Sequence, residues 1–171
     1  MLLGFLAALA VAIFAASVAF TLRRMFNIQA RWIIPASAGA AMFGFTIWND
    51  YTWFDRQLSG LPPEVVVTDA FEHSAALQPW TLIVPVINRY RAVDLRTRTR
   101  HVERPEIARV VVYLAQRYQP TFETVQIIDC ARGLRADARD AGAGGLPSEE
   151  AWVRLEPGDA LQAAVCADGT A

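Results

Sequence analysis

The stretch LLGFLAALAVAIFAASVAFTL, residues 2–22, decides the architecture because it contains no charged residue and no proline. A helix rises 1.5 Å per residue, so about 20 residues cover the ~30 Å hydrocarbon core of a bilayer. A cleaved signal peptide is the alternative, but that class carries basic residues before its apolar stretch. Here Arg23 and Arg24 follow the stretch, and nothing basic precedes Leu2 except the amino terminus. We therefore predict a transmembrane helix that is not cleaved.

A second apolar segment runs from about Trp32 to Trp48 and carries no charge before Asp50. Pro35 lies in its first turn, where a missing backbone N–H costs little. Aromatic residues typical of membrane interfaces flank the segment, namely Trp32 at one end and Trp48, Tyr51 and Trp53 at the other. Because lipid offers no hydrogen-bond partners, both segments should be helical. The predicted fold begins with a membrane α-helical hairpin of two transmembrane helices.

Small side chains recur at four-residue spacing on both predicted spans. They are Gly4, Ala8, Ala12 and Ala16 on the first, and Ala36, Ala40 and Gly44 on the second. Such stripes let helix backbones approach closely, and packing then drives association in lipid. Either one stripe closes the hairpin while another face meets a larger partner, or alanine is simply abundant in this chain. Neither span has an ionisable side chain, which argues against transport or haem ligation within these helices.

The connection between the two spans indicates the orientation. Arg23, Arg24 and Arg31 lie in or beside it. Arginines in short loops stay cytoplasmic, whereas long domains translocate largely regardless of charge. All sixteen basic residues are arginine, a usage typical of GC-rich bacterial genomes. We therefore expect the spans in a bacterial inner (plasma) membrane, with the N-terminus and the C-terminal domain in the periplasm.

Three parts are predicted along the chain: an anchor with an interfacial extension at 1–58, a linker at 59–63, and a periplasmic domain at 64–171. Apolar and β-branched runs predict strands near 64–71, 121–130, 134–138 and 152–155, with two short strands or one bulged strand over 80–93. Residues 107–118 fit a helix or a strand, and their length between two prolines favours a helix narrowly. Asp159 suits the N-cap of a helix from Ala160 to about Ala167. These elements predict a small α+β extramembrane domain.

Both cysteines of the chain, Cys130 and Cys166, fall in the predicted outer domain. An even pair in an oxidising compartment favours a disulfide. Two separate buried thiols, each packing as a small hydrophobe, are the alternative.

No motif indicates a catalytic, cofactor or metal site. The net charge of −1 argues against a nucleic-acid partner, which would need a basic surface. The two histidines, His73 and His101, lack further ligands at metal-binding spacing. The sequence has no G-x-S-x-G motif, and without lysine it cannot form a P-loop. We therefore expect a protein that is not an enzyme and binds no cofactor.

Six arginines lie between Arg89 and Arg104. Arg96, Arg98 and Arg100 alternate there and are candidates for contact with an anionic headgroup or an acidic partner surface. The alternative is a solvated strand edge protected by charge.

These features together favour an accessory or assembly subunit of a larger inner-membrane complex, with an electron-transfer complex as one candidate host. Its expected partners are membrane lipid and other integral membrane subunits. The alternative is a free-standing envelope protein whose periplasmic domain binds an anionic ligand or an envelope polymer. A membrane-tethered enzyme is a third and weaker reading.

Overall fold

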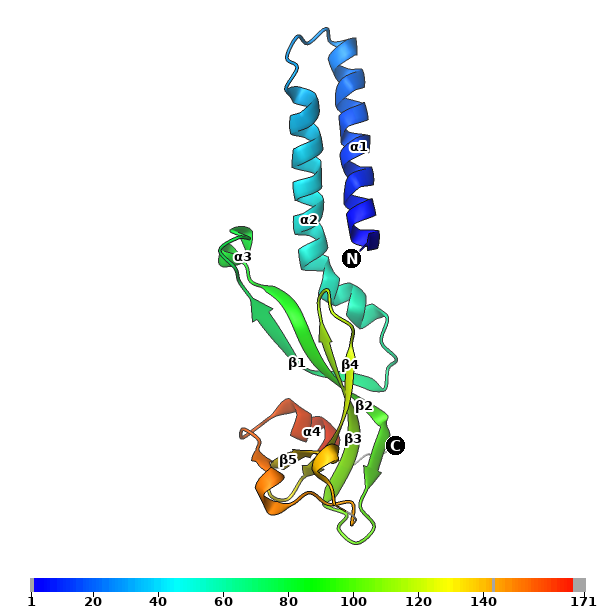
Figure 1. Ribbon diagram of the computed structural model, residues 1–171, viewed down its shortest axis with the longest axis vertical. Helices are drawn as coiled ribbons and strands as arrows, with labels where there is room; N and C mark the ends of the chain where they lie inside the picture. Colours follow the sequence, from blue (N-terminus) through cyan, green and yellow to red (C-terminus); the bar gives the residue numbers. More distant parts are fainter. Residues whose placement is uncertain (1, 143, 168–171) are drawn as a thin grey trace. The chain divides into compact units, whose positions relative to one another are not determined.

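The computed structural model describes residues 2–142 and 144–167 (Figure 1). The chain divides into two compact units. One comprises Met1–Ser59 with Ala75–Val86, and the other comprises Gly60–Ser74 with Ile87–Ala171. The first unit is mainly helical and the second contains most of a six-stranded antiparallel sheet.

Two long helices form the first unit, α1 (Leu2–Met25) and α2 (Ile33–Ser59), and they pack against each other. Arg23 and Arg24 occupy the last turn of α1, and Asn27 then adopts a left-handed φ of 52° in the turn towards α2. Pro35 lies in the first turn of α2, as predicted, where its missing N–H leaves no gap in the helical ladder. Of the described residues, only Gly4–Met25 forms a helix long and apolar enough to cross a membrane, with a mean hydropathy of 2.4. The second span therefore stays a prediction.

A short segment from within the predicted outer domain also belongs to the helical unit. It carries the single-turn helix α3 (Trp80–Ile83), whose Trp80 ring packs edge-on against Phe43 of α2 at 5.0 Å between centroids. The prediction of strand from residue 80 onwards is therefore wrong for the first four residues. Pro79 already has helical backbone angles, and the buried Thr81 hydroxyl donates to the Gln78 carbonyl at 2.7 Å. These local constraints override the β-branched and aromatic composition of the segment.

The second unit is built on strands that pair in sequence order, β1-β2-β3-β4-β5-β6, as a curled antiparallel meander. The strands are β1 (Val65–His73), β2 (Val86–Arg100), β3 (Ile107–Gln116), β4 (Phe122–Asp129), β5 (Leu134–Asp137) and β6 (Val153–Arg154). Two 3-10 turns, η1 (Ala138–Asp140) and η2 (Glu149–Ala151), lie between β5 and β6. With the helix that follows, this arrangement is the α+β organisation predicted for the outer part of the chain.

The narrow preference for a helix over residues 107–118 is wrong, because Ile107–Gln116 forms strand β3 in the middle of the sheet. Ala108, Val110 and Val112 are fully buried, which is the period-two pattern of a strand with one core face. Strand β3 pairs with β2 on one side and with β4 on the other. The β-branched run from Val110 to Val112 fits that doubly paired position better than a helix.

Strand β2 contains a bulge within the arginine-rich run. The register passes from Asp94 opposite Val111 directly to Thr99 opposite Arg109, so four residues of β2 face one of β3. Thr97 Oγ1 accepts a hydrogen bond from the Val111 amide at 2.9 Å and donates to the Asp94 carbonyl at 2.7 Å. The predicted solvated edge is thus partly a bulge whose side chains replace the missing ladder bonds.

Helix α4 (Ala160–Cys166) covers one face of the sheet, and Asp159 caps it as predicted. The Asp159 carboxylate accepts hydrogen bonds from the amides of Leu161, at 2.8 Å, and Gln162, at 3.4 Å. Fully buried Leu161 and Val165 project into a core built from the sheet, with Val93, Ala108, Val110, Val112, Ile128 and Leu155. The predicted disulfide is confirmed: Cys130, directly after β4, is bonded to Cys166, with their Cα atoms 5.6 Å apart.

Removing the disulfide should destabilise the sheet unit. The bond closes a loop with a sequence separation of 36 residues. In the chain-entropy model such a cross-link contributes about 3–4 kcal/mol. In the full chain in detergent, the double variant C130A/C166A should show faster hydrogen exchange at β3 and β4 amides than the oxidised wild type. Reductant should speed exchange in the wild type and leave the double variant unchanged; equal protection in both proteins would contradict a stabilising cross-link.

Candidate functional site

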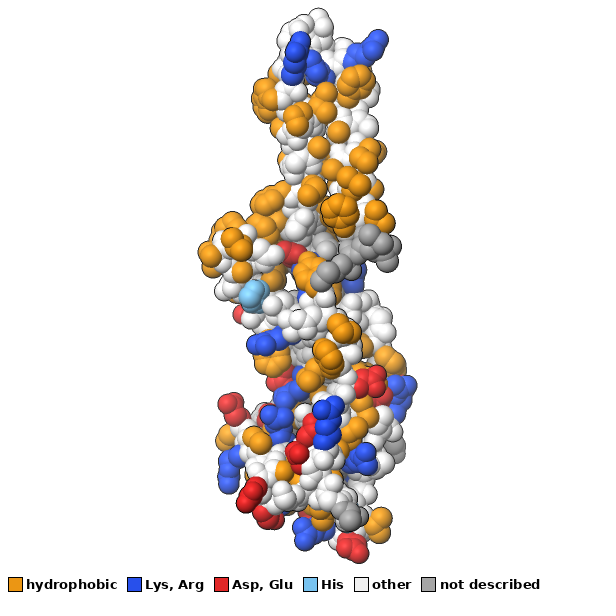
Figure 2. All heavy atoms as spheres, viewed as in Figure 1, with side chains coloured by type: hydrophobic (Ala, Val, Ile, Leu, Met, Phe, Trp, Pro, Cys, Tyr) orange, Lys and Arg blue, Asp and Glu red, His pale blue; other side chains and the backbone are white. Residues whose placement is uncertain are grey.

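The outer surface of the helix pair carries many exposed apolar side chains. Phe5, Phe14, Phe20 and Met25 of α1 are all exposed. Of the most apolar 18-residue stretch of this helix, only 6% is buried. Figure 2 shows hydrophobic side chains over much of the length of both helices, with basic side chains at the end that carries the connecting loop. Such a surface is unfavourable in water, so this unit is the candidate site for contact with lipid or protein. A membrane span and a signal sequence both fit α1 by length and composition.

The structure places the two predicted small-residue stripes differently. Ala8, Ala12 and Ala16 of α1 are half-buried, while Gly4 is exposed. Ala36, Ala40 and Gly44 of α2 are all exposed. A Cβ atom added at Gly44 would meet no atom within 4 Å outside its own helix backbone. The α2 stripe is therefore an open strip of small side chains on the helix pair.

An apolar groove of about 590 Å³ runs between α1 and α2. Small residues of both helices contribute to its lining, with Ala15 and Ala19 from α1 and Ser37 and Ala41 from α2. Ala19 is buried, and among the residues of α1 whose burial is described it is the most enclosed hydrophobic one. None of these four small residues belongs to the predicted stripes, although each is next to a stripe residue or one helical turn away from it. The sequence thus predicted that small residues lie on both helices, but it did not identify the ones that line this groove.

The predicted interfacial aromatic residues have distinct surroundings. Trp32 and Trp48 are exposed, and the Arg56 guanidinium lies 5.3 Å from the centre of a Trp48 ring. Arg56 also donates to Asn49 Oδ1 at 2.6 Å and forms a hydrogen bond with Thr52. The basic side chain thus lies back along α2 over Trp48, where a cation–π contact is favourable. Trp53 is half-buried.

Tyr51 has a role that the sequence did not indicate. Its hydroxyl donates to the Val84 carbonyl at 2.7 Å and lies 3.3 Å from the Trp80 carbonyl. Together with the Phe43–Trp80 contact, these bonds attach residues 75–86 to α2. The available signal was the run AALQPWTLIVPV at 75–86, which has no charge and two prolines.

The three arginines predicted as anionic contacts all have partners within the chain. Arg96 forms a fork on Asp94, with Nε and NH2 donating at 2.9 and 2.7 Å. Arg98 donates to the carbonyls of Val165, at 3.2 Å, and Ala167, at 2.8 Å, where the α4 dipole favours a positive charge. Arg100 donates to the Pro105 carbonyl at 2.9 Å. These side chains therefore stabilise the bulge, the end of α4 and the β2–β3 turn.

Arginine lowers the pKa of two buried carboxylates. Hydrogen bonds from Arg96 hold the pKa of Asp94 below its usual range despite burial. Burial raises the pKa of Asp129, but hydrogen bonds from the Arg132 side chain and amide outweigh it and leave the pKa lowered. Arg132 also lies 3.3 Å from Glu149 and 5.5 Å from the centre of a Trp152 ring. The Asp94–Arg96 fork fixes the β2 bulge, and the Asp129–Arg132 pair fixes the turn that follows β4.

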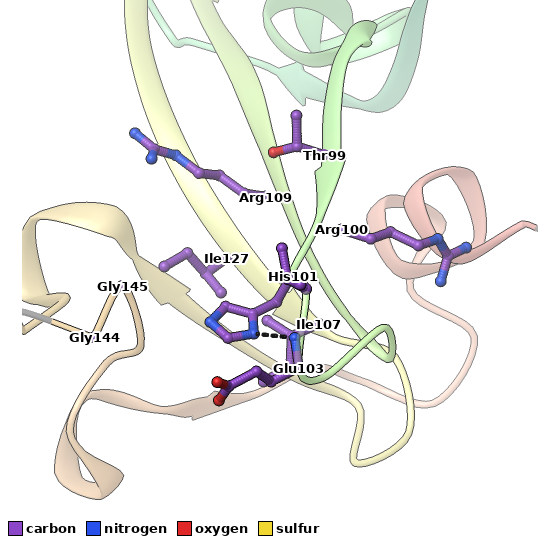
Figure 3. A pocket seen from close by; sticks show the side chains of 10 residues that line it. Thr99, Arg100, His101, Glu103, Ile107, Arg109, Ile127, Gly144 and Gly145 are labelled. Atoms are coloured by element: carbon purple, nitrogen blue, oxygen red, sulfur yellow. Dashed lines mark hydrogen bonds between the residues drawn. The ribbon is translucent and has the colours of Figure 1, made fainter.

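A hollow of about 510 Å³, with polar and apolar residues in its lining, lies around the β2–β3 turn (Figure 3). His101 Nδ1 accepts a hydrogen bond from the Glu103 amide at 3.2 Å, so this nitrogen is occupied within the turn. Figure 3 shows the Arg100 and Arg109 side chains pointing away from the His101 ring on opposite sides. These groups do not converge on a common point, so the hollow lacks the geometry of an anion site. His73, the second histidine, is exposed in β1, far along the chain from His101.

Among residues 2–142 and 144–167, no group of three or more histidine, cysteine, aspartate or glutamate residues could hold a metal ion. Both cysteines are joined in the disulfide, so neither is a free thiol.

The Asp94–Arg96 fork predicts acid sensitivity. Because the pKa of Asp94 is lower in the folded chain than its unfolded value of about 3.9, its contribution is present above that value and is lost as pH falls through the folded pKa. In a mild detergent, the urea midpoint read from sheet circular dichroism should be lower for D94N than for wild type at pH 7. The difference should shrink as pH falls below about 4. E103Q, at an exposed position, should match wild type throughout; a D94N difference that does not depend on pH would contradict the assignment.

No protein-family model matches the chain, and comparison with curated proteins and with solved structures found no match.

Proposed function

We propose that this chain is a non-catalytic accessory or assembly subunit of a larger bacterial inner-membrane complex, anchored by two membrane spans. The observation that carries the proposal is the exposed strip Ala36, Ala40 and Gly44 on a helix pair that is otherwise covered with large apolar side chains. In lipid, helices associate through close backbone approach at small residues. A helix pair that already packs through α1 and still exposes a second small strip is suited to a further helix from another subunit.

The second span is supported by the length and packing of α2. The charge-free part of α2, residues 33–49, extends about 26 Å at 1.5 Å per residue, which is at the short end of the range for helices that cross the ~30 Å hydrocarbon core. Met42, Phe43 and Trp48 expose apolar side chains along it, and α1 packs beside it. The small, hydroxyl and aromatic residues of α2 lower its hydropathy without adding a charge before Asp50.

The proposed orientation places the sheet unit in the periplasm. Arg23, Arg24 and Arg31 lie at the connecting loop, which the positive-inside tendency keeps cytoplasmic. The Cys130–Cys166 disulfide supports the same side, because disulfides persist in oxidising compartments. A free-standing protein that binds an anionic envelope ligand has weaker support, since Arg96, Arg98 and Arg100 are engaged within the chain.

Partner association is tested by mild solubilisation and native separation, with mass spectrometry of what accompanies the tagged full chain. The wild type should co-purify with stoichiometric membrane subunits. The variant A40F should lose them, because a bulky ring on the open strip prevents close backbone approach. A10F, at an exposed alanine of α1, is the matched control and should retain them. Recovery of the wild type alone in several detergents would sink the proposal, as would unchanged partners in A40F.

Orientation is tested by introducing single cysteines, which are selective because both native cysteines are in the disulfide. In cells with a permeabilised outer membrane, an impermeant maleimide should label E103C, in the sheet unit, without lysis. The loop variant Q29C should react only after the inner membrane is broken, because its loop is proposed to be cytoplasmic. The reverse labelling pattern would contradict the orientation. Labelling of both sites while the inner membrane is unbroken would contradict the second span.

A further inference from the structure

Residues 75–86 form a lobe whose exposed side chains are almost all apolar. Leu77 is 95% exposed and Ile83 is 84% exposed, and Leu82 and Val84 are also exposed. The run contains no charged residue, from Ala75 to Val86. Figure 2 shows hydrophobic side chains gathered over the lobe that carries α3 in Figure 1. Four large apolar side chains exposed together within eight residues are a patch that calls for an apolar neighbour.

The lobe is held at a defined position along α2. The Trp80 ring packs edge-on against Phe43, and the Tyr51 hydroxyl donates to the Val84 carbonyl at 2.7 Å. These two anchor points on α2 are eight residues apart, which is about 12 Å of helix. Phe43 lies inside the proposed second span, and Tyr51 lies among its predicted interfacial aromatic residues. The lobe therefore lies beside the part of α2 that is proposed to leave the membrane.

Several backbone amides of the lobe donate to groups of the lobe itself. The amides of Gln78, Thr81 and Val84 donate to carbonyls within the segment at 2.8–3.1 Å. The Ala75 amide donates to Thr81 Oγ1 at 2.9 Å, and Thr81 is fully buried. Pro79 and Pro85 have no amide hydrogen to satisfy. Such internal pairing is what contact with lipid requires, because lipid offers backbone groups no partner.

We propose that residues 75–86 are a third membrane contact of this chain, with Leu77, Leu82, Ile83 and Val84 inserted into the leaflet that surrounds the end of α2. The inference rests on the proposed second span, since α2 fixes the level of the lobe. Elements that lie at a bilayer surface bury their apolar face about 5–10 Å into the boundary between headgroups and acyl chains. An insertion by half of the distance between Phe43 and Tyr51 along α2, about 6 Å, would fall within that range of depths.

Lipid is the favoured occupant because the patch continues an apolar surface that is itself proposed to face lipid. Met42 and Trp48 expose apolar side chains on the same stretch of α2 that holds the lobe. Tyr51 and Trp80, which attach the lobe, are the residue types enriched where membranes meet water. Val102 is also an exposed apolar side chain, but it lies in the β2–β3 turn between His101 and Glu103. It is therefore an internal control for the apolar patch of the lobe.

The test uses the full oxidised chain in nanodiscs of phosphatidylcholine and phosphatidylglycerol. Single cysteines L77C, I83C, M42C and V102C each carry the environment-sensitive fluorophore NBD, and circular dichroism verifies that every variant is folded. Lipids with a nitroxide near the headgroup or deep in the acyl chain then quench any label that lies at their depth. The label at 83, and the one at 77, should be blue-shifted and quenched most strongly by the shallow nitroxide. The label at 102 should be quenched by neither.

The label at 42 separates the two levels of the proposal. Quenching at 42 without quenching at 77 and 83 would overturn the lobe insertion and leave the second span standing, and would assign the lobe to a protein partner instead. Absence of quenching at 42, 77 and 83 would overturn both the second span and the inference that rests on it. Equal quenching at 102 and 83 would overturn the inference as well, because any exposed apolar side chain would then give the same signal.

Discussion

Each backbone amide and carbonyl placed among apolar groups must find a partner within the chain, and much of this structure follows from that constraint. In the helical unit, α1 and α2 meet it through their own ladders while leaving apolar side chains outside. In residues 75–86, turn bonds and the Thr81 hydroxyl do the same over a much shorter length. In strand β2 the bulge removes ladder partners, and Thr97 supplies one in their place. The two helices, residues 75–86 and the β2 bulge thus all satisfy backbone groups with partners that lie close by.

The most predictable parts of the fold were those in which local chemistry has a single solution. The apolar run at 2–22 could hardly be anything but a long helix, and Asp159 after Pro157 and Gly158 marked the start of α4. The cysteine pair followed from its even number and its place outside the apolar segments. The open face of Ala36, Ala40 and Gly44 was visible as a spacing, but which stripe faces α1 depends on the rotation of two helices about their axes.

The wrong secondary-structure predictions fall on segments whose conformation depends on residues distant in sequence. Ile107–Gln116 has the length of a short helix, and only its pairing with β2 and β4 makes the alternation of Ala108, Val110 and Val112 decisive. Trp80–Ile83 has the composition of a strand, yet the ring of Phe43 and the hydroxyl of Tyr51 hold it against α2. The internal partners of the arginine run were only partly visible in the sequence: Arg96 and Arg100 bond to residues close by, whereas Arg98 bonds to Val165 and Ala167, nearly seventy residues away. Arginine suits these internal roles since its planar fork binds a carboxylate or two carbonyls at once.

The division of the chain into units has a mechanical consequence. The chain passes between the helical unit and the sheet unit at 59–60, 74–75 and 86–87. A protease that cuts the linker at Gly60–Pro63 therefore separates α2 covalently from everything after it, but the downstream fragment still includes the residues bound to Phe43 and Tyr51. After such a cut, the downstream fragment would still be held to α2 by non-covalent contacts. Release of the sheet unit from the helix pair would take both the cut and the detachment of residues 75–86 from α2.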